Sequence, residues 1–163
     1  MKREEVLVLF DRYHNAVYRL ALSYTRSPQD AEDIVQTVFL KLLETGRQPE
    51  PGREKAWLLK ITANASRDLL RALRRRQWEP LDEGIPAFRQ LEEGRLFAAV
   101  MDLPQTYRAA VYLHYFEGYT LEELARFFKV SPSAVSMRLH RARKLLEKEL
   151  REGQDETAFP NNL

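Results

Sequence analysis

Basic residues cluster in the stretch KITANASRDLLRALRRRQW, residues 60–78, and their spacing predicts a surface that binds an anion. On an α-helix, which turns by about 100° per residue, seven residues of this stretch fall within about 60° of one line, and Arg76 is the one cation among the apolar positions. This basic stripe comprises Lys60, Asn64, Arg67, Arg71, Arg74, Arg75 and Trp78. Asp68 is the only acid between Ile61 and Trp78, and it lies off the stripe. A merely solvated face normally mixes both signs of charge, so we prefer an anionic partner.

A second basic segment, TLEELARFFKVSPSAVSMRLHRARKLLEKEL at residues 120–150, has the spacing of a helix-turn-helix. Thr120 caps a predicted short helix, a turn follows at residues 129–131, and Pro132 begins a second helix. Lys129 must then adopt a turn conformation that favours glycine. The residues expected to be buried are Leu121, Leu124, Ala125, Phe128, Val135, Leu139 and Ala142. An ordinary helical hairpin would share this apolar pattern, so the pattern alone does not decide.

The outer face of the second predicted helix favours DNA as the partner. Short polar groups come first and suit close approach to base edges, while the cations that follow suit phosphates. This helix has no acid before Glu147. The candidate DNA-binding residues are Ser133, Ser136, Met137, Arg138, His140, Arg141 and Lys144.

Helices must position both basic segments, because helical periodicity dominates the chain and no convincing strand pattern occurs. We predict a first helix over Arg3–Thr25 that packs through Val6, Leu9, Phe10, Tyr13, Val17, Leu20 and Tyr24. Ser27 and Pro28 start the next helix as N-cap and first helical residue. Its apolar side comprises Ala31, Ile34, Val35, Val38, Phe39 and Leu42, and its opposite side presents Asp30, Asp33, Gln36, Thr37 and Lys41. The stripe helix is expected to bury Leu58, Ile61, Ala65, Leu69, Ala72 and Leu73.

Two stretches rich in Pro and Gly divide the chain. TGRQPEPG, residues 45–52, predicts a loop before the stripe helix, and EPLDEGIPAF, residues 79–88, is typical of a linker between domains. Further helices are expected near residues 89–101 and 105–117, and the tail after Gly153 is expected to be disordered. The predicted fold class is all-α, with two small helical domains joined by a flexible linker.

Composition limits the classes of function. The 163 residues include no cysteine, which excludes disulfides and thiolate metal sites. The formal net charge of +2 is unevenly spread, because residues 1–77 carry 15 Lys or Arg against 10 Asp or Glu, and residues 78–103 carry 2 against 6. The N-terminus has no uninterrupted apolar run after its charges, so we expect a cytoplasmic protein without a signal peptide or membrane span.

Two classes of function are compatible with parts of the sequence, an enzyme and a stand-alone helix-turn-helix regulator. An enzyme has little support, because His14, His114 and His140 are scattered and the chain has no HExxH, P-loop or nucleophile motif. We therefore expect no cofactor, no metal and no small-molecule substrate. A stand-alone helix-turn-helix regulator is the alternative, and it would bind an operator without polymerase, usually as a dimer. No apolar dimer seam stands out after Leu150, which counts against it.

Four segments resemble bacterial sigma factors of the extracytoplasmic-function type, the minimal class with only the second and fourth conserved sigma regions. They are SPQDAEDIVQTVFLKLL, KAWLLKITANASRDLLRALRRR, DLPQTYRAAVYLHYFEGYTLEELARFF and SPSAVSMRLHRARKLL, which cover most of residues 5–150 in the family's order. The resemblance implies region 2 at residues 1–78, a linker at 79–88, region 4 at 89–150 and a disordered tail at 151–163. It also implies a factor that binds core RNA polymerase and directs promoter-specific initiation, as part of a stress or envelope response.

The resemblance further assigns roles to residues. The helix after Ser27 would dock on the clamp helices of the polymerase's largest subunit through Asp30, Asp33, Gln36, Thr37 and Lys41. The stripe helix would recognise and open the minus-ten element through Lys60, Asn64, Arg67, Arg71, Arg74 and Arg75. The preceding loop, residues 45–53, would hold an everted base, while Trp57 and Ile61 mostly hold the helix in place. Ser133, Ser136, Met137, Arg138, His140, Arg141 and Lys144 would read the minus-thirty-five element.

The implied partners are therefore core RNA polymerase, promoter DNA and an anti-sigma protein, with no insertion into a membrane. The second helix of the helix-turn-helix departs from the family, which usually has Gly-Thr where this chain has Ser133 and Ala134. The family also has Lys or Arg before a Ser-Arg pair, where this chain has Ser136 and Met137. A promoter preference therefore does not transfer from the family to this chain.

Overall fold

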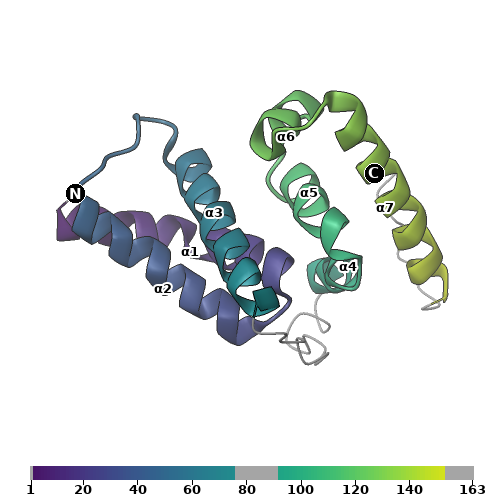
Figure 1. Ribbon diagram of the computed structural model, residues 1–163, viewed down its shortest axis with the longest axis horizontal. Coiled ribbons are helices and arrows are strands. Elements are labelled where there is room, and N and C mark those ends of the chain that lie inside the picture. Colours follow the sequence, from purple (N-terminus) through teal and green to yellow (C-terminus); the bar gives the residue numbers. More distant parts are fainter. Residues whose placement is uncertain (1, 76–91, 153–163) are drawn as a thin grey trace. The chain divides into compact units, whose positions relative to one another are not determined.

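The computed structural model describes residues 2–75 and 92–152, which form seven α-helices and contain no strand (Figure 1). This confirms the all-α class. The chain divides into two compact units, Met1–Glu83 and Gly84–Leu163. The predicted linker, Trp78 and the tail from residue 153 lie outside the described residues, whereas residues 151 and 152, which were predicted to be disordered, end the last helix. The described helices include none that is both long and apolar enough to cross a membrane.

The N-terminal unit contains α1 (Arg3–Thr25), α2 (Pro28–Thr45) and α3 (Glu54–Arg75), and its first turn follows the prediction. Arg26 ends α1 with a left-handed backbone (φ 54°), and its N–H donates to the Leu22 carbonyl at 2.7 Å. The Ser27 hydroxyl accepts from the Asp30 N–H at 3.2 Å and caps α2, with Pro28 at its first position. This tight turn reverses the chain, so α2 packs back along α1 (Figure 1).

The core of this unit lies between the three helices, but α3 presents a different face to it from the one predicted. Ile61, Ala65, Leu69, Ala72 and Leu73 are only half-buried, whereas Leu58, Leu59, Thr62, Ala63 and Ser66 are buried. The reason is that α3 packs more extensively on α1 than on α2, which turns its buried side toward α1. Thr62 can lie there because its hydroxyl donates to the Leu58 carbonyl at 2.7 Å.

Two aromatic residues of α1 are also less buried than expected. Phe10 is 37% exposed, and its ring meets the edge of Phe39 at 5.1 Å and stacks on His14 at 4.6 Å. Tyr13 is half-buried. The periodicity of α1 correctly indicated its inner side, but these two residues lie at the margin of that side.

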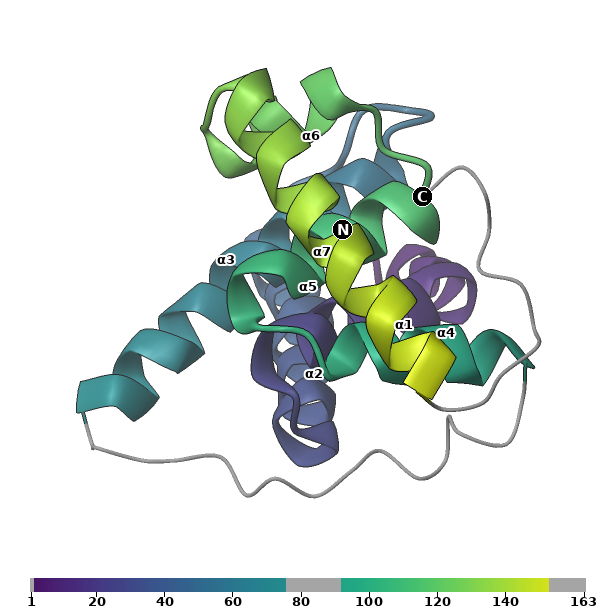
Figure 2. The ribbon, with the colours of Figure 1, turned by 90° about the vertical axis from the view of Figure 1, so that its right-hand side faces the viewer.

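The C-terminal unit contains α4 (Glu92–Met101), α5 (Gln105–Tyr115), α6 (Leu121–Phe128) and α7 (Pro132–Glu152), with α7 crossing α5 and α4 (Figure 2). Its core includes an aromatic cluster in which Phe97 meets the edges of Tyr112 and Phe116 at 6.0 and 5.7 Å. The Tyr112 hydroxyl donates to Glu117 Oε1 at 2.9 Å. This cluster joins α4 to the end of α5.

The helix-turn-helix forms where the sequence predicts it. Thr120 and Glu123 make a reciprocal capping box, each backbone N–H donating to the other's side chain at 3.2 Å. Lys129 ends α6 in a left-handed conformation (φ 56°, ψ 47°), and the Val130 N–H donates to the Ala125 carbonyl at 3.0 Å. The turn residue therefore behaves as predicted.

The apolar faces of α6 and α7 were only partly predicted. Leu124, Ala125, Val135 and Ala142 are buried as expected. Leu121 is 38% exposed, and Phe128 and Leu139 are half-buried, so their predicted burial was wrong. Phe127 and Leu146 are buried instead, because the ring of Phe127 turns onto Tyr119 at 5.8 Å and Leu146 lies on the inner side of α7.

Candidate polymerase and nucleic-acid interfaces

The basic stripe lies along the outer side of α3, and five of its described members are exposed. These are Lys60, Asn64, Arg71, Arg74 and Arg75. Arg67 differs from them, because it is half-buried and its guanidinium lies 5.9 Å from the centre of the Tyr24 ring. One Arg67 nitrogen also donates to the Tyr24 hydroxyl at 3.4 Å. Arg67 therefore joins α3 to α1, which the spacing of charges could not show.

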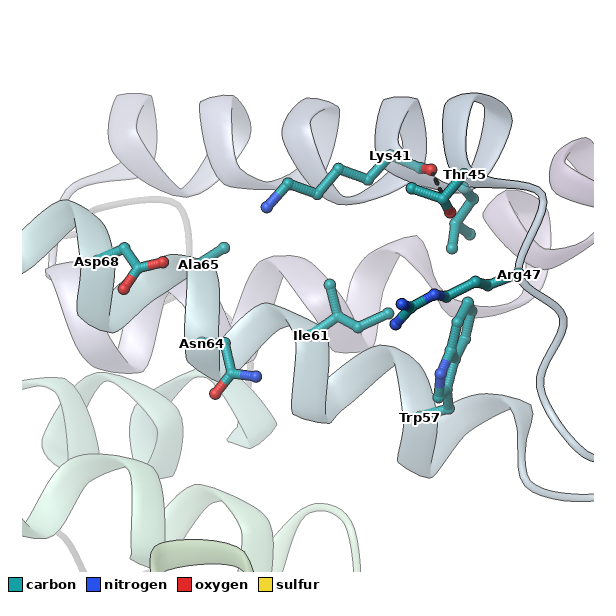
Figure 3. A pocket seen from close by; sticks show the side chains of 9 residues that line it. Lys41, Thr45, Arg47, Trp57, Ile61, Asn64, Ala65 and Asp68 are labelled. Atoms are coloured by element: carbon teal, nitrogen blue, oxygen red, sulfur yellow. Dashed lines mark hydrogen bonds between the residues drawn. The ribbon is translucent and has the colours of Figure 1, made fainter.

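A cavity of about 520 Å³ lies beside the stripe, between α2, α3 and the loop that joins them (Figure 3). Trp57 and Arg47 lie together at one end of the cavity and Asp68 lies at the other, while the Lys41 side chain begins beside Thr45 and extends toward the Asp68 end. The lining is completed by Leu42, Thr45, Ile61, Asn64 and Ala65. Two of the half-buried α3 residues that were expected in the core, Ile61 and Ala65, thus form part of the wall of this cavity. It combines an aromatic ring, two cations, an amide and a carboxylate.

The loop that closes the cavity has a defined start and end. Gly46 terminates α2 with φ 64°, and Gly52 has φ 83° just before α3. The Gly52 N–H donates to Glu54 Oε1 at 3.1 Å. Backbone hydrogen bonds from Glu54 itself and from Gly52 lower the pKa of the Glu54 carboxyl, so it is ionised at the positive end of α3.

The outer side of α2 carries only part of the predicted polymerase-docking set. Asp33, Gln36 and Thr37 are exposed. Asp30 is half-buried in the first turn, with its Oδ2 atom buried, because its backbone is held by the Ser27 cap. Lys41 is exposed but lines the cavity, on the side of α2 that faces α3. The structure therefore separates Lys41 from Asp33 and Gln36.

Two leucines that sequence reasoning missed lie on the same side of α2. Leu40 is 54% exposed and Leu43 is 43% exposed. They follow Gln36 at helical spacings of four and seven residues, which is the signal that could have found them. The exposed polar residues of α2 thus continue into an apolar surface.

Most residues of the predicted DNA-binding set are exposed on the outer face of α7. Its exposed members are Ser133, Ser136, Met137, His140, Arg141 and Lys144, and Arg138 is half-buried. The Ser131 hydroxyl accepts from the Ala134 N–H at 3.1 Å and caps the helix. Arg143, which lies nearby, is instead bonded to Glu147 through its Nε at 3.0 Å. The leading turns of α7 therefore present short polar side chains, and cations follow.

Comparison with known proteins agrees with this arrangement. The family model of Sigma-70 region 2 matches residues 9–77, and that of Sigma-70 region 4 matches residues 93–146. RNA polymerase sigma factor SigV of Bacillus subtilis is 35% identical, over 82% of this chain and 83% of its own length. The chain belongs to the extracytoplasmic-function sigma factors. The two matches fall in the two compact units.

Other relatives support the same family. RNA polymerase sigma factor CarQ of Myxococcus xanthus is 32% identical, over 92% of this chain and 91% of its own length. ECF RNA polymerase sigma factor SigE of Mycolicibacterium smegmatis is 33% identical over 92% of this chain, which spans 63% of that relative's length. As a sigma factor, the protein binds core RNA polymerase and promoter DNA and directs transcription initiation.

Solved structures share the fold. CnrH, in a complex with the cytosolic domain of CnrY, is 27% identical with a TM-score of 0.62, over 93% of this chain and 90% of that chain. The sigma factor RpoE of Bartonella quintana, in a complex with the anti-sigma factor NepR, has a TM-score of 0.67 at 24% identity, over 91% of this chain and 96% of that chain.

Proposed function

We propose that this sigma factor binds core polymerase, the minus-ten element and the minus-thirty-five element through three different surfaces. The outer side of α2, with Asp33, Gln36 and Thr37, docks on core polymerase. The basic stripe and the cavity beside it capture the opened strand of the minus-ten element, and the outer face of α7 reads the minus-thirty-five element. The observation that carries this proposal is the cavity, because it lies beside exposed cations and contains groups that can hold an unstacked base.

The energetics of base capture favour the Trp57 end of the cavity. Removing a base from a duplex stack costs a few kcal/mol, and stacking on an aromatic side chain returns about 1–3 kcal/mol per base. Trp57 is half-buried and lies next to the Arg47 guanidinium, so it offers a ring and a cation together (Figure 3). The loop of residues 46–53 starts and ends at the fixed turns of Gly46 and Gly52. An everted base placed there would meet both the loop and α3.

Filling the cavity tests this role. Ala65→Trp places a large side chain in the cavity, and Ala56→Trp makes the same change at an exposed site on α3 outside it. Holoenzyme assembled with each variant is offered fragmented genomic DNA, and opened promoters are detected by permanganate reactivity of unpaired thymines. We expect A65W to bind core polymerase but to open no promoter, and A56W to behave as wild type. Normal opening by A65W would exclude the cavity from base capture.

Docking is tested on α2. Asp33→Ala with Gln36→Ala removes an exposed acid and an exposed amide, and Asp11→Ala with Asn15→Ala makes the matched change on α1 as a control. We expect the α2 double variant to lose co-elution with core polymerase on size exclusion and the control to keep it. Full recruitment of the α2 double variant would place the docking surface elsewhere.

We further infer that an anti-sigma protein regulates this sigma factor in a stress or envelope response. Support comes from the neighbouring RpoE structure, which is a complex with the anti-sigma factor NepR. The exposed leucines of α2, Leu40 and Leu43, offer an apolar surface that such a partner could cover. A factor with this role works in the cytoplasm beside the polymerase and has no catalytic activity of its own.

A further inference from the structure

Asp68, the only acid of α3 beyond its first turn, lies in the cavity at the end away from Trp57. Asp68 and Trp57 are eleven residues apart on α3, which is about 16 Å along the helix axis. A base stacked on Trp57 therefore does not reach Asp68. If the proposed base capture holds, the far end of the cavity is left for a second, neighbouring base.

The groups at this far end differ from those beside Trp57. Asp68 and Asn64 of α3 lie toward this end, and the Lys41 side chain of α2 extends toward them (Figure 3). An ionised carboxylate only accepts hydrogen bonds, an ammonium group only donates them, and an amide does both. This end therefore offers an acceptor, a donor and an amide to the edge of a base.

Two neighbouring interactions leave this set of groups intact. The Thr45 hydroxyl donates to the Lys41 carbonyl at 2.9 Å, so toward the cavity its oxygen can only accept. Arg71 approaches Asp68 Oδ1 at 3.7 Å, but both side chains are about 70% exposed (69% and 71%) and solvent screens the pair. Asp68 can therefore exchange this partner for a base at little cost.

We propose that Asp68 accepts a hydrogen bond from the exocyclic amino group of this second base, so that this subsite takes cytosine, adenine or guanine, which carry such a group, and rejects thymine. Acidic side chains pair with the N4 amino group of cytosine, and asparagine pairs with adenine. Lys41 would donate to a ring nitrogen or carbonyl of the same base. Thymine has no amino group, and its ring N–H lies between two carbonyl oxygens that a carboxylate repels.

The test uses holoenzyme and pre-opened promoter fragments in which the single-stranded minus-ten segment is randomised. Bound fragments are sequenced, and base preferences are compared between variants. With the wild-type chain we expect one position, next to the base captured at Trp57, to select against thymine by about tenfold, the size of one base contact. Asp68→Asn should admit thymine there, because an amide can also donate, and Asp68→Ala should remove the preference at that position alone.

Two controls separate this inference from its alternatives. Arg71→Ala removes the exposed partner of Asp68 and should weaken binding without changing the base preference. Glu44→Ala removes an exposed acid of α2 that does not line the cavity, and it should change neither the binding of the fragments nor the base preference. If both Asp68 variants keep the wild-type preference while A65W still fails to open promoters, base selection by Asp68 is wrong and base capture stands. If A65W opens promoters normally, both proposals fail together.

Discussion

Arg67 and Arg71 belong to the same predicted stripe, but their surroundings in the structure differ, and we expect different roles for them. Arg67 is half-buried against Tyr24, with a 5.9 Å approach to the ring and a 3.4 Å hydrogen bond. A cation over a ring contributes about 0.5–1 kcal/mol. A hydrogen bond near the distance limit adds about 0.5 kcal/mol. We therefore expect Arg67→Ala to destabilise the N-terminal unit by about 1–1.5 kcal/mol.

Arg71 has no comparable role in the fold. Both side chains of its ion pair with Asp68 are exposed, and such pairs contribute about 0–1 kcal/mol to the stability of a fold. Each phosphate contact of single-stranded DNA adds about 0.7 to the slope of log affinity against log salt. Arg71→Ala should therefore lower this slope by about 0.7 and leave the free energy of unfolding nearly unchanged. Arg67→Ala should instead lower the free energy of unfolding and leave the slope nearly unchanged.

Two measurements separate these outcomes. Calorimetry of the full chain gives the melting temperature of the N-terminal unit, which a loss of 1 kcal/mol lowers by about 4–8 °C in a unit of this size. Fluorescence anisotropy of holoenzyme on pre-opened promoter DNA, between about 50 and 200 mM salt, gives the slope. Tyr24→Phe removes only the hydroxyl, and its effect should not add to that of R67A.

Identical behaviour of the two arginine variants would contradict these separate roles. If R67A melts like the wild type and lowers the salt slope as much as R71A does, Arg67 contacts DNA like any other cation of the stripe. Its packing on Tyr24 would then contribute nothing to the fold.

Three further predictions concern local structure. Lys129→Gly should stabilise the C-terminal unit by about 0.5–1 kcal/mol in urea unfolding, because glycine adopts the left-handed turn without strain, and Lys129→Ala should give no such gain. Ser27→Ala should cost about 1 kcal/mol by removing the cap of α2, and an unchanged melting temperature would contradict this. Burial raises the pKa of Tyr119 and of Tyr115 to about 12, so above about pH 10 the unfolded chain loses protons that the folded unit keeps, and stability falls as pH rises toward 12. Tyr119→Phe should flatten that fall in urea titrations at alkaline pH, and an unchanged pH dependence would show that Tyr119 is not its source.

Local signals in the sequence predicted where helices begin and end. Ser27 with Pro28, and Thr120 with Glu123, cap helices through bonds within three residues, so no distant partner is needed. The bounds of α1 and the first residue of α7 agree with the prediction for the same reason. The exposed face of α7 was also predictable, because polar and basic residues of one helix share a face by spacing alone.

The helical class, the caps and the charged sides of α3 and α7 can be predicted from the sequence, because each depends on residue type and helical period. The buried side of α3 could not be predicted in this way, since it depends on where α1 and α2 lie around that helix. The same packing buries Arg67 on Tyr24, turns Lys41 toward α3 and opens a cavity that brings Asp68 and Trp57 into one site. The spacing of residues predicts their angles around one helix, but it does not predict how far away or on which side the neighbouring helices lie.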